Sequence, residues 1–267
     1  MRHITISGDI GSGKSLVARK LANLLNYRTA SVGQLQRMMA ADHGLTTLEA
    51  NRLAERVPQL DELIDVAIVD LSRQSVGTIF DSRMAWHLVP SAFKVHLIAD
   101  PAVGAERIWR DRVSHIESYS SAAEAEWAAE QRHRSERTRF KDRHGVDISL
   151  LRNYDLVIDT TFASPDEIVA EIRAALTSHR GEVNLRIDTR RINPLPASAD
   201  WSPSRGSADY PVVGYVRPDF FLLEPARESA AKLAVHGLVP AMLGSEGENM
   251  GHDVPKPRNR ISADSYA

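Results

Sequence analysis

The sequence of 267 residues contains no cysteine, which excludes disulfide bonds and thiolate metal sites. It has no run of about 18 apolar residues, so no membrane-spanning helix is expected. Positive and negative charges nearly balance, and the formal net charge of −2 gives no overall field that would attract nucleic acid or an anionic membrane. The ten histidines are scattered without a ligand spacing, so no zinc site is expected. The first residues, "MRHITISGDIG", indicate a strand that enters a loop rather than a signal peptide, so we expect a soluble, cytoplasmic protein with neither a nucleic-acid nor a membrane partner.

Strand-like and helix-like segments alternate over residues 1–179. Short runs rich in β-branched and aromatic residues predict strands at 3–7, 27–31, 78–81, 94–99 and 154–159. Helical periodicity predicts helices at 14–25, 47–55, 60–74, 102–112, 121–143 and 164–176. Ser164 and Glu167 are spaced to form a capping box at the start of the last helix. This alternation predicts an α/β fold, a parallel sheet with helices on both faces.

The composition changes after about residue 180. Residues 191–211 are rich in Pro, Ser and Asp and predict a loop. The segment that follows predicts a strand, a turn at Pro218–Asp219, a second strand, a helix over 225–235 and a short final strand. We therefore expect a small α+β module at 180–244, followed by a disordered tail at 245–267.

The octapeptide "GDIGSGKS" at residues 8–15 matches the phosphate-loop pattern G-x-x-x-x-G-K-[ST]. Glycines allow successive backbone N–H groups to turn inward around an anion, and the helix that begins there adds its positive end. The predicted cofactors are ATP and Mg²⁺, with Lys14 on the β- and γ-phosphates and Ser15 on the metal ion. The predicted nucleotide-binding residues are Gly8, Asp9, Gly11, Ser12, Gly13, Lys14 and Ser15. The alternative is a glycine-rich turn with an exposed lysine.

Three further features bear on what receives the phosphoryl group. Gly33 and Arg37 stand at the start of a helix after the second strand-like segment, where Arg37 could bind an acceptor phosphate. Asp81 ends a buried strand and Arg83 follows it. Ligands of open parallel sheets bind at the carboxyl ends of the strands, which places Asp81 near Mg²⁺ or the attacking hydroxyl and Arg83 near an acceptor phosphate. The alternatives are that Arg37 is a solvated helix charge and that Asp81 only caps a helix.

The third feature is the basic helical stretch at residues 130–145. Arg132 and Arg139 are seven residues apart and share a helix face, so both could turn inward as part of a mobile lid. Phosphoryl transfer depends on positioning and charge neutralisation, which such arginines supply. Because glutamates are interleaved in the stretch, a solvated charged face is the alternative.

These features, in this order, resemble the cytidylate kinase family over residues 3–175. The family has a phosphate loop after its first strand, a Gly-x-x-x-Arg element matched by Gly33 and Arg37, and an acidic residue–Gly–Arg segment matched by Asp81 and Arg83. Its lid helix is matched by Arg132, Ser135, Glu136, Arg139 and Phe140, with "HGVD" at 144–147 and "YDLVIDTT" from 154 following.

The chain departs from this family in its acceptor region. Ser82 replaces the usual glycine, Gln34 stands where an acid is frequent, and the bulky Trp86 and His87 are expected to reshape the acceptor pocket. The resemblance implies a nucleoside monophosphate kinase and, more narrowly, CMP as the acceptor.

Residues 183–243 resemble the ParB/sulfiredoxin-type fold more faintly, through the run from Leu223 to Ala231. Pro225 stands where that fold has a glycine, and Glu228 where it is usually basic; both changes weaken anion binding. We expect a degenerate module that serves packing, dimerisation or acceptor recognition. A second nucleotide or effector site that uses Arg227 is the alternative, and a homodimer stays open.

The sequence therefore predicts an ATP-dependent phosphotransferase acting on a nucleoside monophosphate, either CMP or dCMP or a modified pyrimidine nucleotide. The alternatives are a kinase of a non-nucleotide small-molecule alcohol and a non-catalytic, nucleotide-binding regulatory protein. The predicted catalytic residues are Lys14, Asp81, Arg132 and Arg139. The predicted substrate-binding residues are Gly33, Arg37 and Arg83, and the predicted metal ligands are Ser15 and Asp81.

Overall fold

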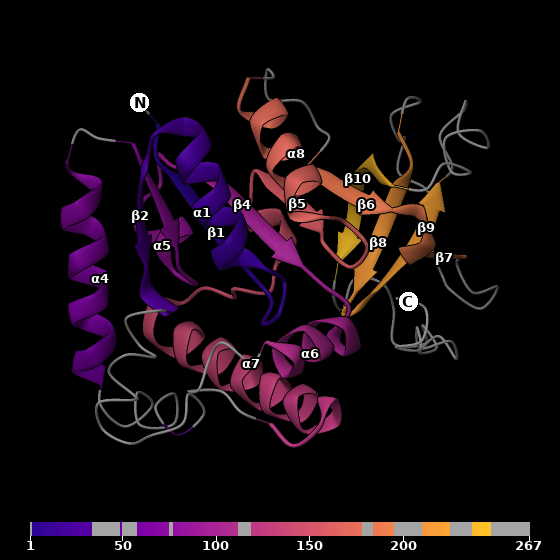
Figure 1. Cartoon of the computed structure of the whole chain (residues 1–267), viewed down its shortest axis with the longest axis horizontal. Helices are drawn as coiled ribbons and strands as arrows, with labels where there is room; N and C mark the ends of the chain where they lie inside the picture. Colours follow the sequence, from indigo (N-terminus) through magenta and orange to yellow (C-terminus); the bar gives the residue numbers. More distant parts are fainter. Residues whose placement is uncertain are drawn as a thin grey trace.

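The structure, a computed structural model, describes residues 2–33, 49, 58–74, 77–111, 119–177, 184–194, 210–224 and 237–246 (Figure 1). Several sequence predictions lie outside these residues. They are Gln34, Arg37 and Arg227, the helix at 47–55 except for Glu49, the helix at 225–235, and the tail from residue 247 onward.

The first part of the chain forms the parallel sheet that the alternation predicts. Its strands are β1 (Ile4–Gly8), β2 (Arg28–Ser31), β3 (Thr78–Asp81), β4 (Phe93–Ile98) and β5 (Leu156–Asp159). They pair in parallel in the order β2-β3-β1-β4-β5, so β1 lies between β3 and β4. This arrangement confirms the predicted α/β class and brings the carboxyl ends of β1 and β3 together.

Helices cover both faces of this sheet. Helices α1 (Lys14–Leu25) and α8 (Pro165–Thr177) bury Val17, Leu21, Ile168 and Ile172 against the face that carries Ile6 and its neighbours. On the other face lie α5 (Ala85–Leu88) and α7 (Ala122–His144), which contribute Trp86 and Phe140 to a second core. Helix α4 (Pro58–Ser72) packs beside β3 and α5. Helix α6 (Pro101–Arg110) lies along α7 (Figure 1).

The strands after residue 184 extend the same sheet. They are β6 (Leu185–Asp188), β7 (Ile192–Pro194), β8 (Val212–Val216), β9 (Asp219–Glu224) and β10 (Leu238–Glu246). Strand β6 pairs in parallel with β5, and the order then continues β6-β10-β8-β9-β7 to give ten strands in all. Side chains of β6, β8 and β9 also join the core beneath α7. The boundary expected at residue 179 coincides with no break in the sheet, and an independent module at 180–244 stays a prediction.

Two details differ from the sequence expectations. Strand β7 forms at 192–194, within the expected loop, because its backbone pairs with β9. Strand β10 runs nine residues and reaches Glu246, inside the expected tail, because Ser245 and Glu246 pair with Gly214 and Tyr215. In both places a neighbouring strand supplies backbone hydrogen-bond partners, so pairing does not require an alternating apolar pattern. Among the described residues, no helix is long and apolar enough to cross a membrane.

Candidate active site

The phosphate loop joins the end of β1 to the start of α1. Strand β1 ends at Gly8, and α1 begins at Lys14 after Gly13, whose left-handed φ of 82° turns the chain into the helix. Among the described residues no side chain caps this helix end, and its first turn carries no acidic residue. The backbone N–H groups and positive dipole end of α1 are therefore available to an anion.

Gly11 shows why the loop requires glycine. Its φ is +79°, and a Cβ atom placed on it would lie 2.2 Å from the carbonyl oxygen of Gly104 in α6. Any side chain would therefore push the loop away from α6 as well as strain its backbone.

Lys14 and Asp9 organise the interior of the loop. The Lys14 ammonium donates to the Asp9 backbone carbonyl at 2.7 Å, and the Ser12 hydroxyl donates to the same carbonyl at 2.8 Å. The Asp9 carboxylate accepts from the backbone N–H of Ala99 at 3.3 Å. Burial and the nearby Arg83 guanidinium lower the pKa of Lys14 to about 7, in spite of the opposing charge of Asp81. A phosphate group at the loop would stabilise the charged form of Lys14 again.

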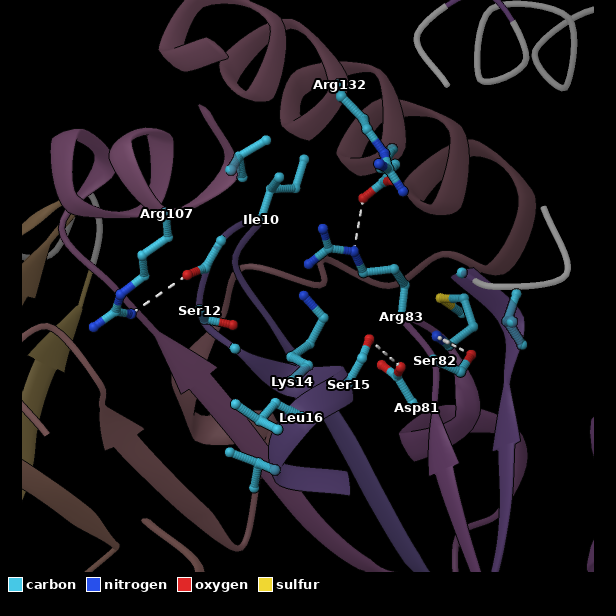
Figure 2. Close-up of a pocket in the computed structure, with 18 of the residues that line it drawn as sticks. Ile10, Ser12, Lys14, Ser15, Leu16, Asp81, Ser82, Arg83, Arg107 and Arg132 are labelled. Carbon is cyan, nitrogen blue, oxygen red and sulfur yellow. Dashed lines mark hydrogen bonds and ion pairs between the residues drawn. The ribbon is translucent and has the colours of Figure 1, made fainter. Parts of the chain in front are cut away.

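An oxygen cluster stands beside the loop. The Ser15 hydroxyl donates to Asp81 Oδ2 at 2.7 Å (Figure 2), and the Ser31 hydroxyl donates to the same oxygen at 2.8 Å. Asp81 is 5% exposed and ends β3, as the sequence predicts. Hydroxyl and carboxylate oxygens are ligands that Mg²⁺ prefers, so Ser15 and Asp81 fit the metal ion that a phosphate loop implies.

Arginine side chains enter the cavity from the opposite side. Glu136 of α7 holds two of them: its Oε1 lies 2.8 Å from Arg132 Nε and its Oε2 lies 2.8 Å from Arg83 Nε. Burial alone would raise the pKa of Glu136, but Arg83 and Arg132 lower it to about 2. In Figure 2, Arg132 descends from α7 toward the space that Lys14 and Arg83 approach from below. The Glu136 carboxylate therefore holds the Arg132 side chain in the inward orientation that the sequence suggests.

Arg139 lies seven residues after Arg132 on the same face of α7, and its side chain contacts α4. Its Nε is 3.1 Å from Asp61 Oδ2, and the side chains are 9% and 5% exposed. Asp65, one turn later on α4, lies 3.6 Å from Arg143 Nε and 3.3 Å from His144 Nε2. Burial raises the pKa of Asp61 and of Asp65, although the neighbouring arginine and histidine side chains act to lower it. The far wall of the cavity therefore carries carboxylates as well as guanidinium groups.

The loop, the Ser15–Asp81 pair, the acceptor-side arginines and the carboxylates of Asp61, Asp65 and Glu136 line one cavity of about 600 Å³, a size common among small-molecule sites. Ten of the predicted site residues line it: Gly11, Ser12, Gly13, Lys14, Ser15, Gly33, Asp81, Arg83, Arg132 and Arg139. Gly8 and Asp9, the first two residues of the loop, do not line the cavity, and Arg37 lies outside the described residues.

Three residues that the structure places here were not among the predicted site residues: Glu136, Asp61 and Arg107. Arg107 of α6 donates to the carbonyls of Gly11 at 3.4 Å and Thr160 at 2.7 Å, and so links the phosphate loop to the end of β5. Glu136 belongs to the lid motif, and Asp61 lies in the first turn of α4. Apart from the Arg132–Glu136 pair within α7, their partners are distant in sequence, so no local pattern identifies these contacts.

Comparison with known proteins places the chain in a family. The model of the cytidylate kinase-like family matches residues 3–162. A cytidylate kinase of Methanothrix thermoacetophila is 40% identical over 157 residues, which cover 59% of this chain and 87% of that protein. An S-adenosylmethionine-dependent nucleotide dehydratase of Lacinutrix mariniflava is 32% identical over 62% of this chain but only 34% of its own length. These matches do not test the resemblance of residues 183–243 to the ParB/sulfiredoxin-type fold.

Among solved structures, an uncharacterized protein from Eubacterium ventriosum aligns with a TM-score of 0.50 at 16% identity, covering 67% of this chain and all of the other. That likeness concerns the fold alone. The sequence relatives go further and confirm the predicted enzyme class. The chain belongs to the cytidylate kinase-like family of nucleoside monophosphate kinases.

Proposed function

We propose that the protein transfers the γ-phosphoryl group of ATP, bound with Mg²⁺, to the phosphate of CMP or dCMP. The observation that carries the proposal is the two-sided cavity. Lys14 and the open end of α1 stand on one side, and Arg83, Arg132 and Arg139 stand on the other. Two polyanions can thus be held facing each other, which is the positioning that phosphoryl transfer requires.

The donor side holds ATP through this chain's own groups. The amides of the loop and the ammonium of Lys14 bind the β- and γ-phosphate oxygens. Ser15 and Asp81 would hold Mg²⁺, which supplies positive charge to those oxygens when it is bound. Lys14 gives up its contact with the Asp9 carbonyl to reach the phosphates.

The acceptor side holds the monophosphate. Arg83 and Arg132 each carry several N–H donors, of which Glu136 occupies only part, so a phosphate can share both guanidinium groups with that carboxylate. Such charge-assisted contacts fix the orientation of the acceptor oxygen. With α7 lying over the cavity, water is excluded from the transfer, and loss of ATP to hydrolysis is suppressed.

Asp61 supports cytosine as the base. The cytosine edge carries an amino donor at N4, for which carboxylates are natural acceptors, whereas uracil carries a carbonyl oxygen there. A carboxylate on the cavity wall would favour the first and repel the second. Arg139 keeps Asp61 oriented through their 3.1 Å ion pair. A modified pyrimidine nucleotide that retains the 4-amino group meets the same requirement.

An acceptor panel tests the proposal. ADP release from MgATP is measured with CMP, dCMP, UMP, AMP, GMP, an uncharged polyol and no acceptor. We expect the highest kcat/KM with CMP or dCMP and a low rate without acceptor. Turnover with the polyol but with no nucleotide would overturn the proposal in favour of a small-molecule kinase. Tight ATP binding without turnover on any acceptor would favour a regulatory protein.

Two variants examine the acceptor side. Arg83→Ala should raise the KM for CMP roughly 10- to 100-fold, the loss expected for a charged hydrogen bond, whereas Arg73→Ala, which removes an exposed arginine paired with Asp70, should leave it unchanged. Asp61→Asn should lower the preference for CMP over UMP by roughly 10-fold or more. An unchanged preference would remove the argument for cytosine.

A further inference from the structure

Arg217 lies outside the family match and reaches the phosphate loop. It directly follows β8, in the turn that joins β8 to β9. The match to the cytidylate kinase-like family ends at residue 162, well before this turn. In Figure 1 this turn lies at the end of the sheet nearest α6 and α7. The family resemblance therefore assigns this residue no role.

The Arg217 guanidinium bridges two parts of the active site. Its Nη1 lies 2.9 Å from Glu130 Oε2 of α7, and its Nη2 lies 4.0 Å from Asp9 Oδ1 of the phosphate loop. The side chain is 30% exposed, so the two contacts are partly shielded from water. Burial by itself would raise the pKa of Asp9, but the positive charges of Arg217 and His133 hold it below its usual range.

The turn that carries Arg217 is itself anchored. Arg191, at the end of the short helix that follows β6, donates to the Pro218 carbonyl at 2.9 Å. The same guanidinium lies 2.8 Å from Asp159 at the end of β5 and 3.2 Å from Asp100, which caps α6. Because Arg191 is only 6% exposed and doubly paired, the turn has a fixed position relative to the ends of β5 and α6.

The two elements that Arg217 joins carry opposite sides of the cavity. The phosphate loop holds the ATP side through Lys14, and α7 holds the acceptor side through Arg132 and Glu136. Since in-line transfer is sensitive to displacements of about 1 Å, a bridge between the loop and the helix would preserve their spacing. The β8–β9 turn supplies such a bridge.

We propose that Arg217 is a positioning residue for the kinase reaction, which holds α7 against the phosphate loop by bridging Glu130 and Asp9. The segment that contains β6 to β10 is therefore a working part of the active site rather than a separate appendage. This inference rests on the proposed function only in the choice of assay, because ATP binding reports on it without any acceptor.

The test compares Arg217→Ala and Arg217→Lys with Arg186→Ala. Arg186 is a matched control: it too lies on a strand after residue 184 and pairs across to the kinase part of the chain, but with Glu171 of α8 at 2.7 Å, away from the cavity. Titration calorimetry with a non-hydrolysable MgATP analogue gives affinity, steady-state kinetics with CMP gives kcat and KM, and thermal unfolding checks the fold.

We expect Arg217→Ala to lower the affinity for the analogue and kcat/KM for ATP about tenfold, as the loss of a partly exposed charge-assisted contact implies. Arg217→Lys should restore part of both, and Arg186→Ala should match the wild type. Glu130→Gln should show a smaller loss that does not add to that of Arg217→Ala, because the two changes break the same contact.

Wild-type affinity and kinetics in a folded Arg217→Ala protein would overturn the inference. So would equal losses in Arg217→Ala and Arg186→Ala that follow the fall in thermal midpoint, since those would indicate a general effect on stability. If the wild type bound the analogue but phosphorylated no monophosphate, the proposed function would fail while the binding comparison still decided the role of Arg217.

Discussion

Replacing Glu136 by Gln tests whether one buried carboxylate holds the acceptor-side arginines. Glu136 is 2% exposed, and its two oxygens each lie 2.8 Å from a guanidinium nitrogen, one on Arg83 and one on Arg132. The Glu136→Gln variant keeps the shape of the side chain but removes its charge. Two largely buried cations then lose the counter-charge that offsets their removal from water.

The structure sets the magnitude of the effect. Burial opposes ionisation of Glu136, yet Arg83 and Arg132 lower its pKa from 4.5 to about 2. A pKa lowered by this much corresponds to about 3 kcal/mol of stability at neutral pH, which agrees with the roughly 3–5 kcal/mol lost when one member of a buried pair is removed. We therefore expect the free energy of unfolding of Glu136→Gln to be lower than that of the wild type by about 3 kcal/mol at pH 7.

Urea unfolding with and without CMP measures this difference. The phosphate of CMP supplies negative charge to the same arginines, so CMP should stabilise Glu136→Gln more than it stabilises the wild type. The stabilising effect of a carboxylate with a lowered pKa is complete above its unfolded-state pKa and is lost as the pH falls through its folded-state pKa. The gap between the two proteins should therefore be full above pH 4.5 and shrink as the pH approaches 2.

Glu126→Gln is the matched control, because it makes the same change on the same helix at a position with no ion pair among the described residues. It should alter the free energy of unfolding by less than about 0.5 kcal/mol. If Glu136→Gln proved as stable as this control at pH 7, the electrostatic account of the acceptor side would be refuted.

Three other outcomes follow from the geometry of the loop and of α8. Binding of ATP at pH 8 should take up about one proton, because phosphate returns Lys14 from a pKa of about 7 to its charged form; calorimetry in two buffers of different ionisation enthalpy measures the uptake, and none at all would contradict the assignment. Gly11→Ala should weaken ATP binding by about tenfold or more, because the new Cβ would meet the Gly104 carbonyl at 2.2 Å. An unchanged dissociation constant for ATP would show that the loop can relax. Ser164→Ala should lower the free energy of unfolding by about 1 kcal/mol, as for other N-cap losses, without changing kcat, because among the described residues its hydroxyl bonds to the Glu167 carboxylate and backbone of the capping box. A large effect on kcat would contradict this.

The parts of the fold that depend on neighbouring residues were predictable. Helix α1 has the bounds that its periodicity predicts, β3 ends at Asp81, and Ser164 with Glu167 forms the expected capping box. Each of these depends on contacts within a few positions along the chain. The strands after residue 184 were harder to predict, because β7 and the end of β10 exist through pairing with strands distant in sequence.

The sequence by itself determined the phosphate loop, the strands of the parallel sheet up to β5, and the family to which they belong, since the spacing of residue types within a short segment specifies each of them. The tertiary structure alone decided which charges meet. Glu136 meets Arg83, Asp61 meets Arg139, and Arg217 reaches the loop, although the members of each pair are distant along the chain. The physical reason is that an ion pair depends on distance and burial in three dimensions, which only the packing of α4, α7 and the β8–β9 turn around the sheet defines.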